Sequence, residues 1–198
     1  MQRTLTIMAK APALGRVKTR LARDTGAVEA TRFYRVALAR LLRRLGPDPR
    51  WRTIIAIAPD TEHRPLPSWA RDADAVMPQG GGDLGRRMQR VFDTAPPGPC
   101  IIIGSDIPAI RPHHVAKAFR ALGSHDAVMG PTEDGGYWLI GQKRVPRVLR
   151  CFAGVAWSSG REGAQTLENL APARIALVDV LADVDAGPDH ARWRAGRD

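Results

Sequence analysis

Residues 100–106 read Cys-Ile-Ile-Ile-Gly-Ser-Asp, an unbroken apolar run that ends in two small residues and an acid. A strand covered on both faces shows such a run, whereas a half-exposed strand alternates apolar and polar residues. We therefore expect a buried strand over 100–103 at the centre of a mostly parallel sheet. Its carboxyl end would carry Asp106, and Gly104 and Ser105 would leave room for a ligand.

Strands and helices alternate on both sides of this run. Further strands are expected at 4–9, 53–58, 75–77, 127–129, 137–140 and 175–180. Helices are expected from Val28 to Leu45, from Asp83 to the prolines at 96–99, from Pro112, from Ser158 or Ser159 to about Leu170, and at the C-terminus. This order predicts an α/β fold: a three-layer α/β/α sandwich with a mostly parallel sheet, in one domain over residues 1–198.

The loop over 10–20 packs four cations around one proline and one glycine, just after the first expected strand. The chain carries a net charge of +10, and residues 1–50 hold twelve Lys or Arg against three Asp or Glu. In a sheet of this kind, ligands bind beyond the carboxyl ends of the strands. Backbone N–H groups and fixed cations at a helix start suit a polyphosphate, although an ordinary solvated basic face would also explain the charge.

Carboxylates occur at two places that can meet at the same edge of the sheet. Asp106 follows the central strand, and Asp183 and Asp185 follow the last one. Alternate residues of an extended segment point to the same side. Asp106 and Asp185 could therefore hold one Mg²⁺ or Mn²⁺, which prefer oxygen ligands. The alternative for Asp183 and Asp185 is a pair of solvated acids that cap the final helix.

Two glycine-rich loops complete the candidate site. In Gln79-Gly-Gly-Gly-Asp-Leu-Gly85 the backbone can approach a flat or phosphorylated ligand, and the Gln79 amide suits a nucleobase edge. In 130–141, two glycines after Asp134 form a polar pocket floor, and of Tyr137 and Trp138 one should face the pocket and one the core. The segment 157–159 could close this pocket, or it could simply cap a helix.

Composition excludes several classes of protein. Two lone cysteines favour a reducing cytoplasm and argue against a zinc site. No apolar run is long enough to span a membrane, and the N-terminus lacks the pattern of a signal peptide. We expect no nucleic-acid partner, because no helix-turn-helix or aromatic RNA-binding strand is evident. No Ser/His/Asp or Cys/His arrangement suggests covalent catalysis.

Five strings in this order resemble the DUF2064 family of the nucleotide-diphospho-sugar transferase superfamily, which has the GT-A fold. They are AKAPALGRVKTRL (9–21), GDLGRRM (82–88), IIIGSDIP (101–108), GPTEDGGYWLIG (130–141) and Trp157-Ser158-Ser159. The resemblance covers about residues 5–190, and the first loop is also similar to that of the phospholactate guanylyltransferases. Family members tend to read Asp-x-Asp-Thr-Pro-Glu-Asp-Leu near the C-terminus, where this chain reads Asp-Val-Asp-Ala-Gly-Pro-Asp-His over 183–190.

The resemblance implies roles for particular residues. Nucleotide binding falls to Lys10, Gly15, Arg16, Lys18, Gln79, Gly82 and Asp83. The acceptor substrate would be bordered by Asp134, Gly135, Gly136, Tyr137, Trp157, Ser158 and Ser159. Catalysis falls to Lys18 and Arg20, which would stabilise a leaving pyrophosphate, and to Asp106, which with Asp185 would hold the metal.

These assignments favour a Mg²⁺-dependent (or Mn²⁺-dependent) nucleotidyltransferase. The enzyme would join the nucleoside monophosphate of an NTP to a phosphorylated small molecule and release pyrophosphate. The cationic loop favours this reaction because a triphosphate carries more charge than a nucleotide sugar. Two alternatives stay open: glycosyl transfer from a nucleotide-diphospho-sugar, and a nucleotide-binding regulatory module without turnover.

Overall fold

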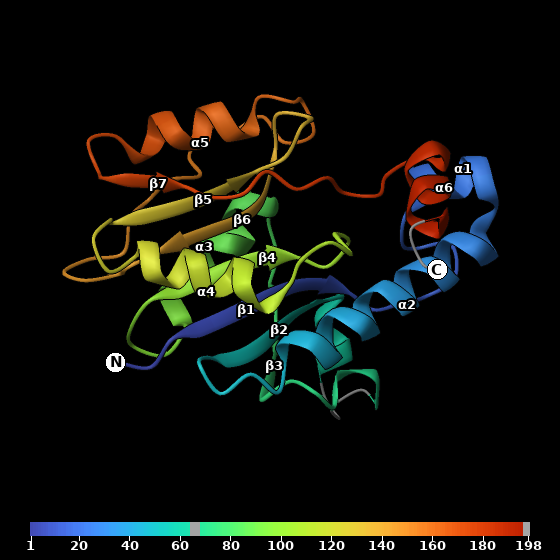
Figure 1. Cartoon of the computed structure of the whole chain (residues 1–198), viewed down its shortest axis with the longest axis horizontal. Helices are drawn as coiled ribbons and strands as arrows, with labels where there is room; N and C mark the ends of the chain where they lie inside the picture. The colour runs from blue at the N-terminus through green and yellow to red at the C-terminus, as the bar shows by residue number, and fades with distance from the viewer. Residues whose placement is uncertain (64–67, 196–198) are drawn as a thin grey trace.

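The computed structural model describes residues 1–63 and 68–195 (Figure 1). Within these residues seven strands form one sheet in the order β3-β2-β1-β4-β6-β5-β7. The strands are β1 (Thr4–Lys10), β2 (Arg52–Ala58), β3 (Ala75–Pro78), β4 (Cys100–Gly104), β5 (Ala127–Pro131), β6 (Tyr137–Gln142) and β7 (Ile175–Leu177). The mostly parallel sheet predicted from the sequence is confirmed.

Strand β6 is the exception to the parallel order. It lies antiparallel between β4 and β5, and the other pairs, β1 with β2 and β4, β2 with β3, and β5 with β7, are parallel. Because β6 runs backwards, its first residue, Tyr137, lies at the edge where β4 and β5 end. The turn between β5 and β6 therefore joins the loops at the ligand-binding edge of the sheet.

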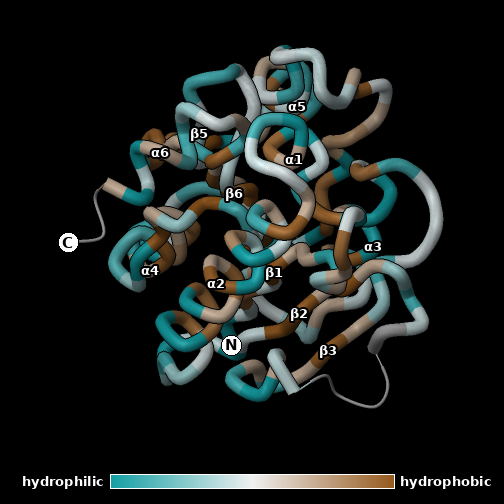
Figure 2. Tube along the Cα trace, turned by 90° about the vertical axis from the view of Figure 1, so that its right-hand side faces the viewer, coloured by the Kyte–Doolittle hydropathy of each residue, from teal (hydrophilic) through white to brown (hydrophobic). Residues whose placement is uncertain are grey.

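Helices cover both faces of the sheet and make the predicted three layers (Figures 1 and 2). Helices α2 (Ala27–Leu45) and α4 (Pro112–Ala121) pack on the face formed by Leu5, Ile7 and Ile101. Helices α3 (Leu84–Thr94) and α5 (Glu162–Leu170) pack on the opposite face. Each helix turns one apolar stripe to the sheet, which drives this packing. None of the helices in the described part of the chain has the length and apolar character needed to cross a membrane.

Three element boundaries differ from the prediction. A separate short helix, α1 (Thr19–Thr25), precedes α2, and the two are divided at Gly26, whose φ of +83° a helix does not allow. Helix α5 begins at Glu162, because Ser159 instead closes the preceding turn by donating its hydroxyl to a backbone carbonyl. Strand β7 ends at Leu177, since only three residues pair with β5.

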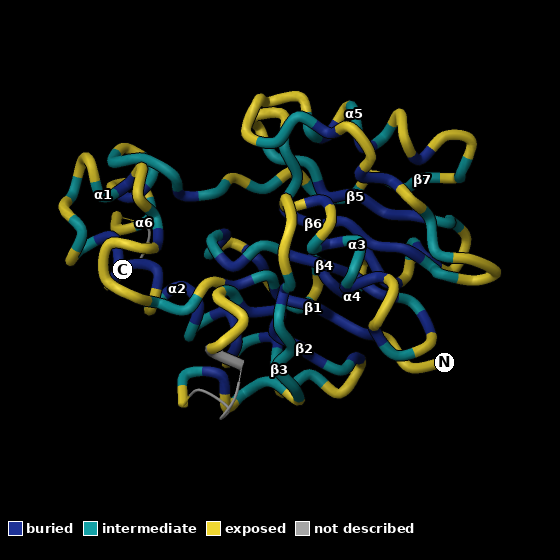
Figure 3. The backbone as a smooth tube through the Cα atoms, turned by 180° about the vertical axis from the view of Figure 1, so that it is seen from behind, coloured by how far each residue is buried: buried dark blue, intermediate teal, exposed yellow. Residues whose placement is uncertain are grey.

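The C-terminal segment returns to the beginning of the chain. From β7 it runs along the ligand-binding edge and ends in α6 (Gly187–Ala195), which lies beside α1 and α2 (Figures 1 and 3). A small core of Leu21, Phe33 and Val184 fixes it there. Trp193 adds an edge-to-face contact with Phe33, with ring centroids 4.7 Å apart. This packing holds the segment that carries Asp183 and Asp185 above the end of β4.

Candidate nucleotide and metal site

The cationic loop and the acid that follows β4 meet at one point. Lys18 precedes helix α1 with a left-handed backbone, φ +47°. Its Nζ lies 2.8 Å from Oδ2 of Asp106 and 2.6 Å from Oδ1 of Asp185. Only 7% of the Lys18 side chain is exposed. The structure thus brings a buried cation into contact with two candidate metal ligands.

The charges of these three groups are coupled. Burial lowers the pKa of the Lys18 ammonium, but the carboxylates of Asp106 and Asp185 together outweigh burial, and the net pKa is raised. The lysine therefore stays protonated at neutral pH. Its ammonium neutralises the two carboxylates in the way that a metal cation would.

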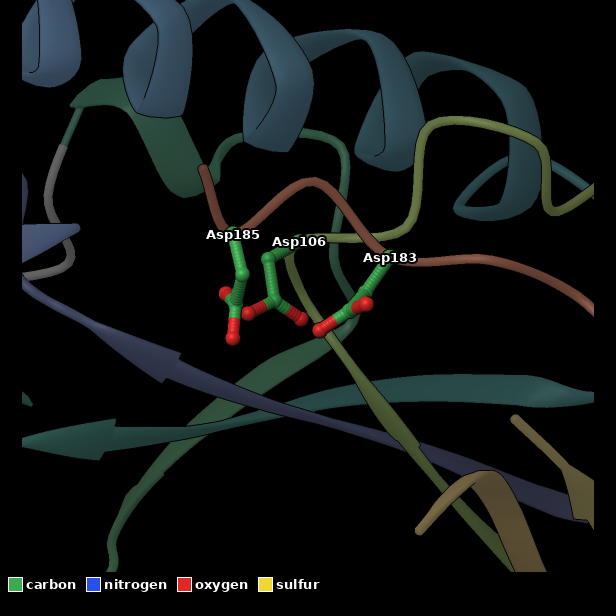
Figure 4. A group of neighbouring side chains, drawn as sticks. All are labelled: Asp106, Asp183 and Asp185. Carbon is green, nitrogen blue, oxygen red and sulfur yellow. The ribbon is translucent and has the colours of Figure 1, made fainter. Parts of the chain in front are cut away.

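Asp183 joins the two carboxylates predicted to bind metal. One carboxylate oxygen from each of Asp106, Asp183 and Asp185 lies within 4.8 Å of the others. Figure 4 shows that these side chains converge from the loop after β4 and from the C-terminal segment. A donor set made only of carboxylate oxygens suits a hard divalent cation such as Mg²⁺ or Mn²⁺. The residues present therefore fit the expected metal, with Asp183 as a third ligand.

The environment of Asp183 disfavours its charged form. Burial raises the pKa of this carboxyl to about 6, and the like charges of Asp185 and Asp106 add to the effect, which Lys18 partly opposes. Three carboxylates facing a single ammonium leave an excess of negative charge. A divalent cation would remove that excess. The raised pKa of Asp183 and the set of carboxylate oxygens therefore both indicate a divalent cation as the ligand.

Metal affinity measured without nucleotide is expected to rise between about pH 5 and pH 7. A raised pKa means that Asp183 holds a proton at pH 5, which a metal must displace, and the cost is up to about tenfold in affinity per pH unit below the pKa. Calorimetric titration with Mn²⁺ across this range measures the effect. Asp183→Asn should flatten the slope, and an unchanged slope in the variant would contradict this assignment.

Tyr34 on α2 organises a polar network that sequence analysis missed. Its hydroxyl accepts a hydrogen bond from the backbone N–H of Lys10 at 2.8 Å and lies 3.1 Å from Oγ of Ser105. Burial raises the pKa of Tyr34 to about 12, so the hydroxyl keeps its proton. The network ties the end of β1 to the loop after β4. Tyr34 lies one helical turn before Leu38, on the face of the helix that packs in the core. Nothing in the sequence therefore indicates that its hydroxyl takes part in the site.

A cleft of about 510 Å³ extends from this network to the glycine-rich turn before α3. This volume lies within the range of about 300–1,000 Å³ that is usual for ligand sites. The polar and glycine residues that line it are Lys10, Lys18, Tyr34, Gln79, Gly82, Asp83, Arg87, Gly104, Ser105 and Asp106. Most of the predicted nucleotide-binding residues therefore surround one cavity.

Gln79 is more constrained than the sequence suggests. Its side chain is buried, and Nε2 donates to the carbonyl oxygens of Ala9 and Ala56, each at 2.9 Å. Its Oε1 lies 3.4 Å from Nη1 of Arg87. With both amide protons committed to the backbone, Gln79 can offer a nucleobase only an acceptor. Arg87 supplies the cation at this end of the cleft, and its place in the quoted GDLGRRM string was the available signal.

The other glycine-loop residues have local roles that position the cleft wall. Asp83 caps α3 by accepting a hydrogen bond from the backbone N–H of Arg86 at 2.8 Å. The carbonyl of Gly82 accepts from Nε of Arg87 at 2.9 Å. Both residues are exposed and line the cleft.

Three residues of the first loop do not line the cleft. Gly15 is exposed in a turn with φ +71°. Arg16 lines a neighbouring hollow with Lys10 and Arg87. Arg20 is 66% exposed, with Nη1 only 3.4 Å from Oδ2 of Asp185. Arg20 therefore borders the metal ligands from the solvent side, whereas Gly15 shapes the loop without a contact to the site.

The residues predicted to border the acceptor come together from two segments. The carbonyl of Gly135 accepts a hydrogen bond from the N–H of Gly163 at 3.0 Å, so the β5–β6 turn packs directly on the start of α5. Asp134 is exposed and accepts hydrogen bonds from the Thr132 hydroxyl and the Gly136 N–H. Ser159 is likewise exposed and closes its own turn.

A second cavity opens between these segments and α3. Gly136, Tyr137, Trp157 and Ser158 line it, whereas Asp134, Gly135 and Ser159 lie outside its lining. Tyr137 is half-buried at the cavity and Trp138 is buried in the core. Both residues line the cavity, although their side chains belong to hydrophobic clusters on opposite faces of the sheet. The expected division into one pocket residue and one core residue stays a prediction.

Gly135→Ala is expected to destabilise the fold by about 2–3 kcal/mol. The glycine has φ +86°, and a Cβ there would lie 2.0 Å from the carbonyl oxygen of Gly160. Urea denaturation measures the loss. Gly154→Ala is the matched control, because Gly154 has φ +66° with nothing within 4 Å of a Cβ, and about 1 kcal/mol is expected there. Equal losses in the two variants would show that backbone conformation, and not packing, governs this turn.

Comparison with known protein families identifies the chain. Residues 41–159 match the family DUF2064, described as an uncharacterized protein conserved in bacteria. The chain belongs to the DUF2064 family. The resemblance expected from the five strings is thereby confirmed. No curated protein matches the sequence.

Solved structures share the fold of this DUF2064 protein. A Desulfovibrio desulfuricans protein, provisionally named a nucleotide-diphospho-sugar transferase, is 28% identical, with a TM-score of 0.87 over 100% of this chain and 89% of its own. The 4-diphosphocytidyl-2C-methyl-D-erythritol synthase of Anaerococcus prevotii is 12% identical, with a TM-score of 0.66 over 98% and 95% of the two chains. A CMP:2-keto-3-deoxy-manno-octonic acid synthetase, solved with CTP, is 14% identical, with a TM-score of 0.56 over 98% of both chains.

These matches confirm the expected α/β fold of the nucleotide-diphospho-sugar transferase type. The Desulfovibrio desulfuricans structure is provisionally named a transferase, and the other two are named a synthase and a synthetase. These names support the expectation that this DUF2064 protein is an enzyme of the nucleotidyl- or glycosyltransferase type.

Proposed function

We propose that this DUF2064 protein is a divalent-cation-dependent nucleotidyltransferase. It transfers the nucleoside monophosphate of an NTP to a small-molecule acceptor, expected from the sequence to be phosphorylated, and releases pyrophosphate. The observation that carries the proposal is the position of Lys18, whose ammonium joins a cationic loop to Asp106 and Asp185. Cations beside carboxylates that can hold a metal are parts that recur in enzymes of phosphoryl transfer.

Residues of the first loop and its surroundings bind the triphosphate in this proposal. Lys18 and Arg20 stand next to the metal ligands and would stabilise the leaving pyrophosphate. Lys10 and Arg87 line both the cleft and the hollow beside it, so they would neutralise charge farther along the nucleotide. Fixed cations in a partly enclosed site stabilise developing negative charge without reorganisation.

Asp106, Asp183 and Asp185 would hold the metal. When bound, a divalent cation neutralises phosphate oxygens and raises the electrophilicity of phosphorus. The acceptor oxygen attacks the α-phosphorus in line, the bond from the α-phosphorus to the bridging oxygen breaks, and that oxygen leaves with pyrophosphate. The protein contributes position and charge, and no covalent enzyme intermediate is required.

Glycosyl transfer from a nucleotide-diphospho-sugar is the second candidate function. The provisional name of the Desulfovibrio desulfuricans relative, at 28% identity, favours it. In that reaction the same cations would stabilise a leaving nucleoside diphosphate. The concentration of cations in the first loop favours the first candidate, because a triphosphate carries the larger charge.

A pyrophosphate-release screen separates the two functions. The purified protein is incubated with Mg²⁺ or Mn²⁺, each common NTP, and a panel of sugar phosphates and small phosphate esters. Nucleotidyl transfer predicts pyrophosphate that depends on both NTP and acceptor. If no NTP yields pyrophosphate while UDP- or GDP-sugars are consumed, the nucleotidyltransferase proposal is wrong.

A further inference from the structure

The second cavity adjoins the nucleotide cleft. It measures about 210 Å³ and shares three lining residues with the cleft: Met8, Leu84 and Gly104. A molecule seated there would hold one end at Gly104, two residues before Asp106. The volume is smaller than that of the usual ligand pocket, which holds about 300–1,000 Å³. The cavity therefore suits a compact molecule that reaches the reacting phosphorus.

The walls of this cavity are apolar and aromatic. Met8, Met88 and Ile102 belong to one hydrophobic cluster with the rings of Tyr137 and Trp157. The ring of Trp157 packs directly against the backbone of Gly85. A Cβ on Gly85 would lie 2.8 Å from Cζ2 of Trp157, so only glycine allows this close packing. Neither Lys nor Arg occurs among the lining residues of the described chain. An anionic group would therefore find no cationic partner inside the cavity.

Glu162 is the one charged residue that lines the cavity. Its Oε1 accepts a hydrogen bond from the N–H of Ser159 at 2.9 Å. Its Oε2 is buried and accepts no hydrogen bond, and within the described residues Glu162 forms no ion pair. A buried carboxylate oxygen without a donor is unfavourable by itself. Because a buried charge is also costly unless it is paired, the free oxygen indicates a cationic group that comes from a ligand.

Neighbouring groups support this reading of Glu162. Burial raises the pKa of Tyr137, the Thr166 hydroxyl lowers it, and the charge of Glu162 contributes to raising it. The tyrosine hydroxyl and the carboxylate are therefore close enough to interact electrostatically, and both residues line the cavity. Negative charge and aromatic faces together form an environment that attracts a cation.

We propose that this cavity binds the acceptor and selects a compact amino alcohol or its phosphate ester, with the ammonium group innermost. Glu162 pairs with the ammonium, and the rings of Tyr137 and Trp157 contact its alkyl substituents. The nucleophilic hydroxyl or phosphate oxygen then lies at Gly104, toward Asp106. The inference rests on the proposed nucleotidyl transfer for the reaction, although binding of the cation does not depend on it.

Both forms of the acceptor, the phosphate ester and the free alcohol, can attack the α-phosphorus with pyrophosphate as the leaving group. A phosphate oxygen of the ester attacks the α-phosphorus and forms a new phosphoanhydride as pyrophosphate leaves. A free hydroxyl would form a phosphodiester in the same way and lose its proton to solvent. The phosphate of the ester, when present, stays at the mouth of the cavity near Lys18. No anionic group of the ligand then enters the apolar interior.

Calorimetric titration with four small probes tests the selection. The probes are choline, its neutral carbon analogue in which a tert-butyl group replaces trimethylammonium, phosphocholine, and glycolate as an anion. Choline is expected to bind at least about tenfold more tightly than its neutral analogue, which has the same shape, and glycolate is expected not to bind. Comparison of choline with phosphocholine shows which of the two acceptor forms the site prefers.

Glu162→Gln is the decisive variant. The amide oxygen can still accept from the Ser159 N–H, but the charge is lost, so choline should weaken about tenfold while the neutral analogue changes little. Glu168→Gln is the matched control, because Glu168 is exposed on the same helix. Circular dichroism and unfolding temperature verify that both variants fold as the unaltered protein does.

The outcomes distinguish the pocket from the reaction. Four outcomes would each overturn the inference. They are equal binding of choline and its neutral analogue, preference for glycolate, failure of all probes to bind at millimolar concentration, and an unchanged preference for the cation in Glu162→Gln. All four titrations are made without nucleotide. Suppose that no NTP yields pyrophosphate but choline still binds more weakly to Glu162→Gln than to the unaltered protein. The proposed function then fails, while the assignment of the pocket stands.

Discussion

Asp106→Asn is expected to lower NTP-dependent pyrophosphate release by about 10³-fold. Asp106 is the carboxylate at the end of the central strand, and it contacts Lys18 and lies within the cluster of three acids. The asparagine keeps the shape of the side chain and removes the charge that holds a divalent cation. The measurements are the pyrophosphate-release rate and the affinity for Mn²⁺, and both should fall together.

Asp93→Asn is the control for this substitution. Asp93 lies on α3 and pairs with the exposed Arg150 at 2.8 Å. An exposed pair of this kind contributes little to stability, so activity and metal affinity should stay near those of the unaltered protein. Activity of Asp106→Asn within about tenfold of the unaltered enzyme would remove the carboxylate from the proposed mechanism.

Lys18→Met is expected to change two quantities in opposite directions. Pyrophosphate release should fall by about 10²–10³-fold, because the methionine cannot stabilise charge on the leaving group. Metal affinity without nucleotide should rise by about tenfold or more, because the ammonium that faces Asp106 and Asp185 no longer competes with the metal. Kinetics and Mn²⁺ calorimetry measure the two effects separately.

The second effect follows from the geometry of the structure. With the ammonium in place, a metal must enter a site whose charge is already partly neutralised, and Lys18 must turn toward the phosphates. Lys117→Met is the control, since Lys117 pairs with Asp179 on the surface at 2.7 Å. Weaker metal binding in Lys18→Met would show that the lysine supports the carboxylates instead of competing for them.

Sequence patterns were sufficient for the layers of the fold. The apolar run at 100–103 predicted the central strand, because strands covered on both faces are usually near-continuous apolar runs. Helical spacing in 28–45 predicted α2 in the same way. The break between α1 and α2 was not predictable from spacing, since it depends on the single backbone angle at Gly26.

The candidate site could be predicted as a set of loops, but its contacts could not. Lys18 and Asp185 lie 167 residues apart, and their 2.6 Å contact depends on how the C-terminal segment crosses the sheet edge. Gln79 looked free to contact a base, yet its amide protons are held by backbone carbonyls. Tyr34 was not part of the predicted site, because helical periodicity does not distinguish a phenol from an apolar ring.

The return of the C-terminal segment to α1 and α2 has a consequence for biogenesis. Two of the three clustered acids are translated after all seven strands of the described sheet, and they are anchored by α6 rather than by the sheet. A nascent chain can therefore form its layers before it possesses a complete cation site. Cleavage or a bulky fusion close to residue 187 would therefore abolish enzymatic turnover. The rest of the protein would still unfold in one cooperative transition.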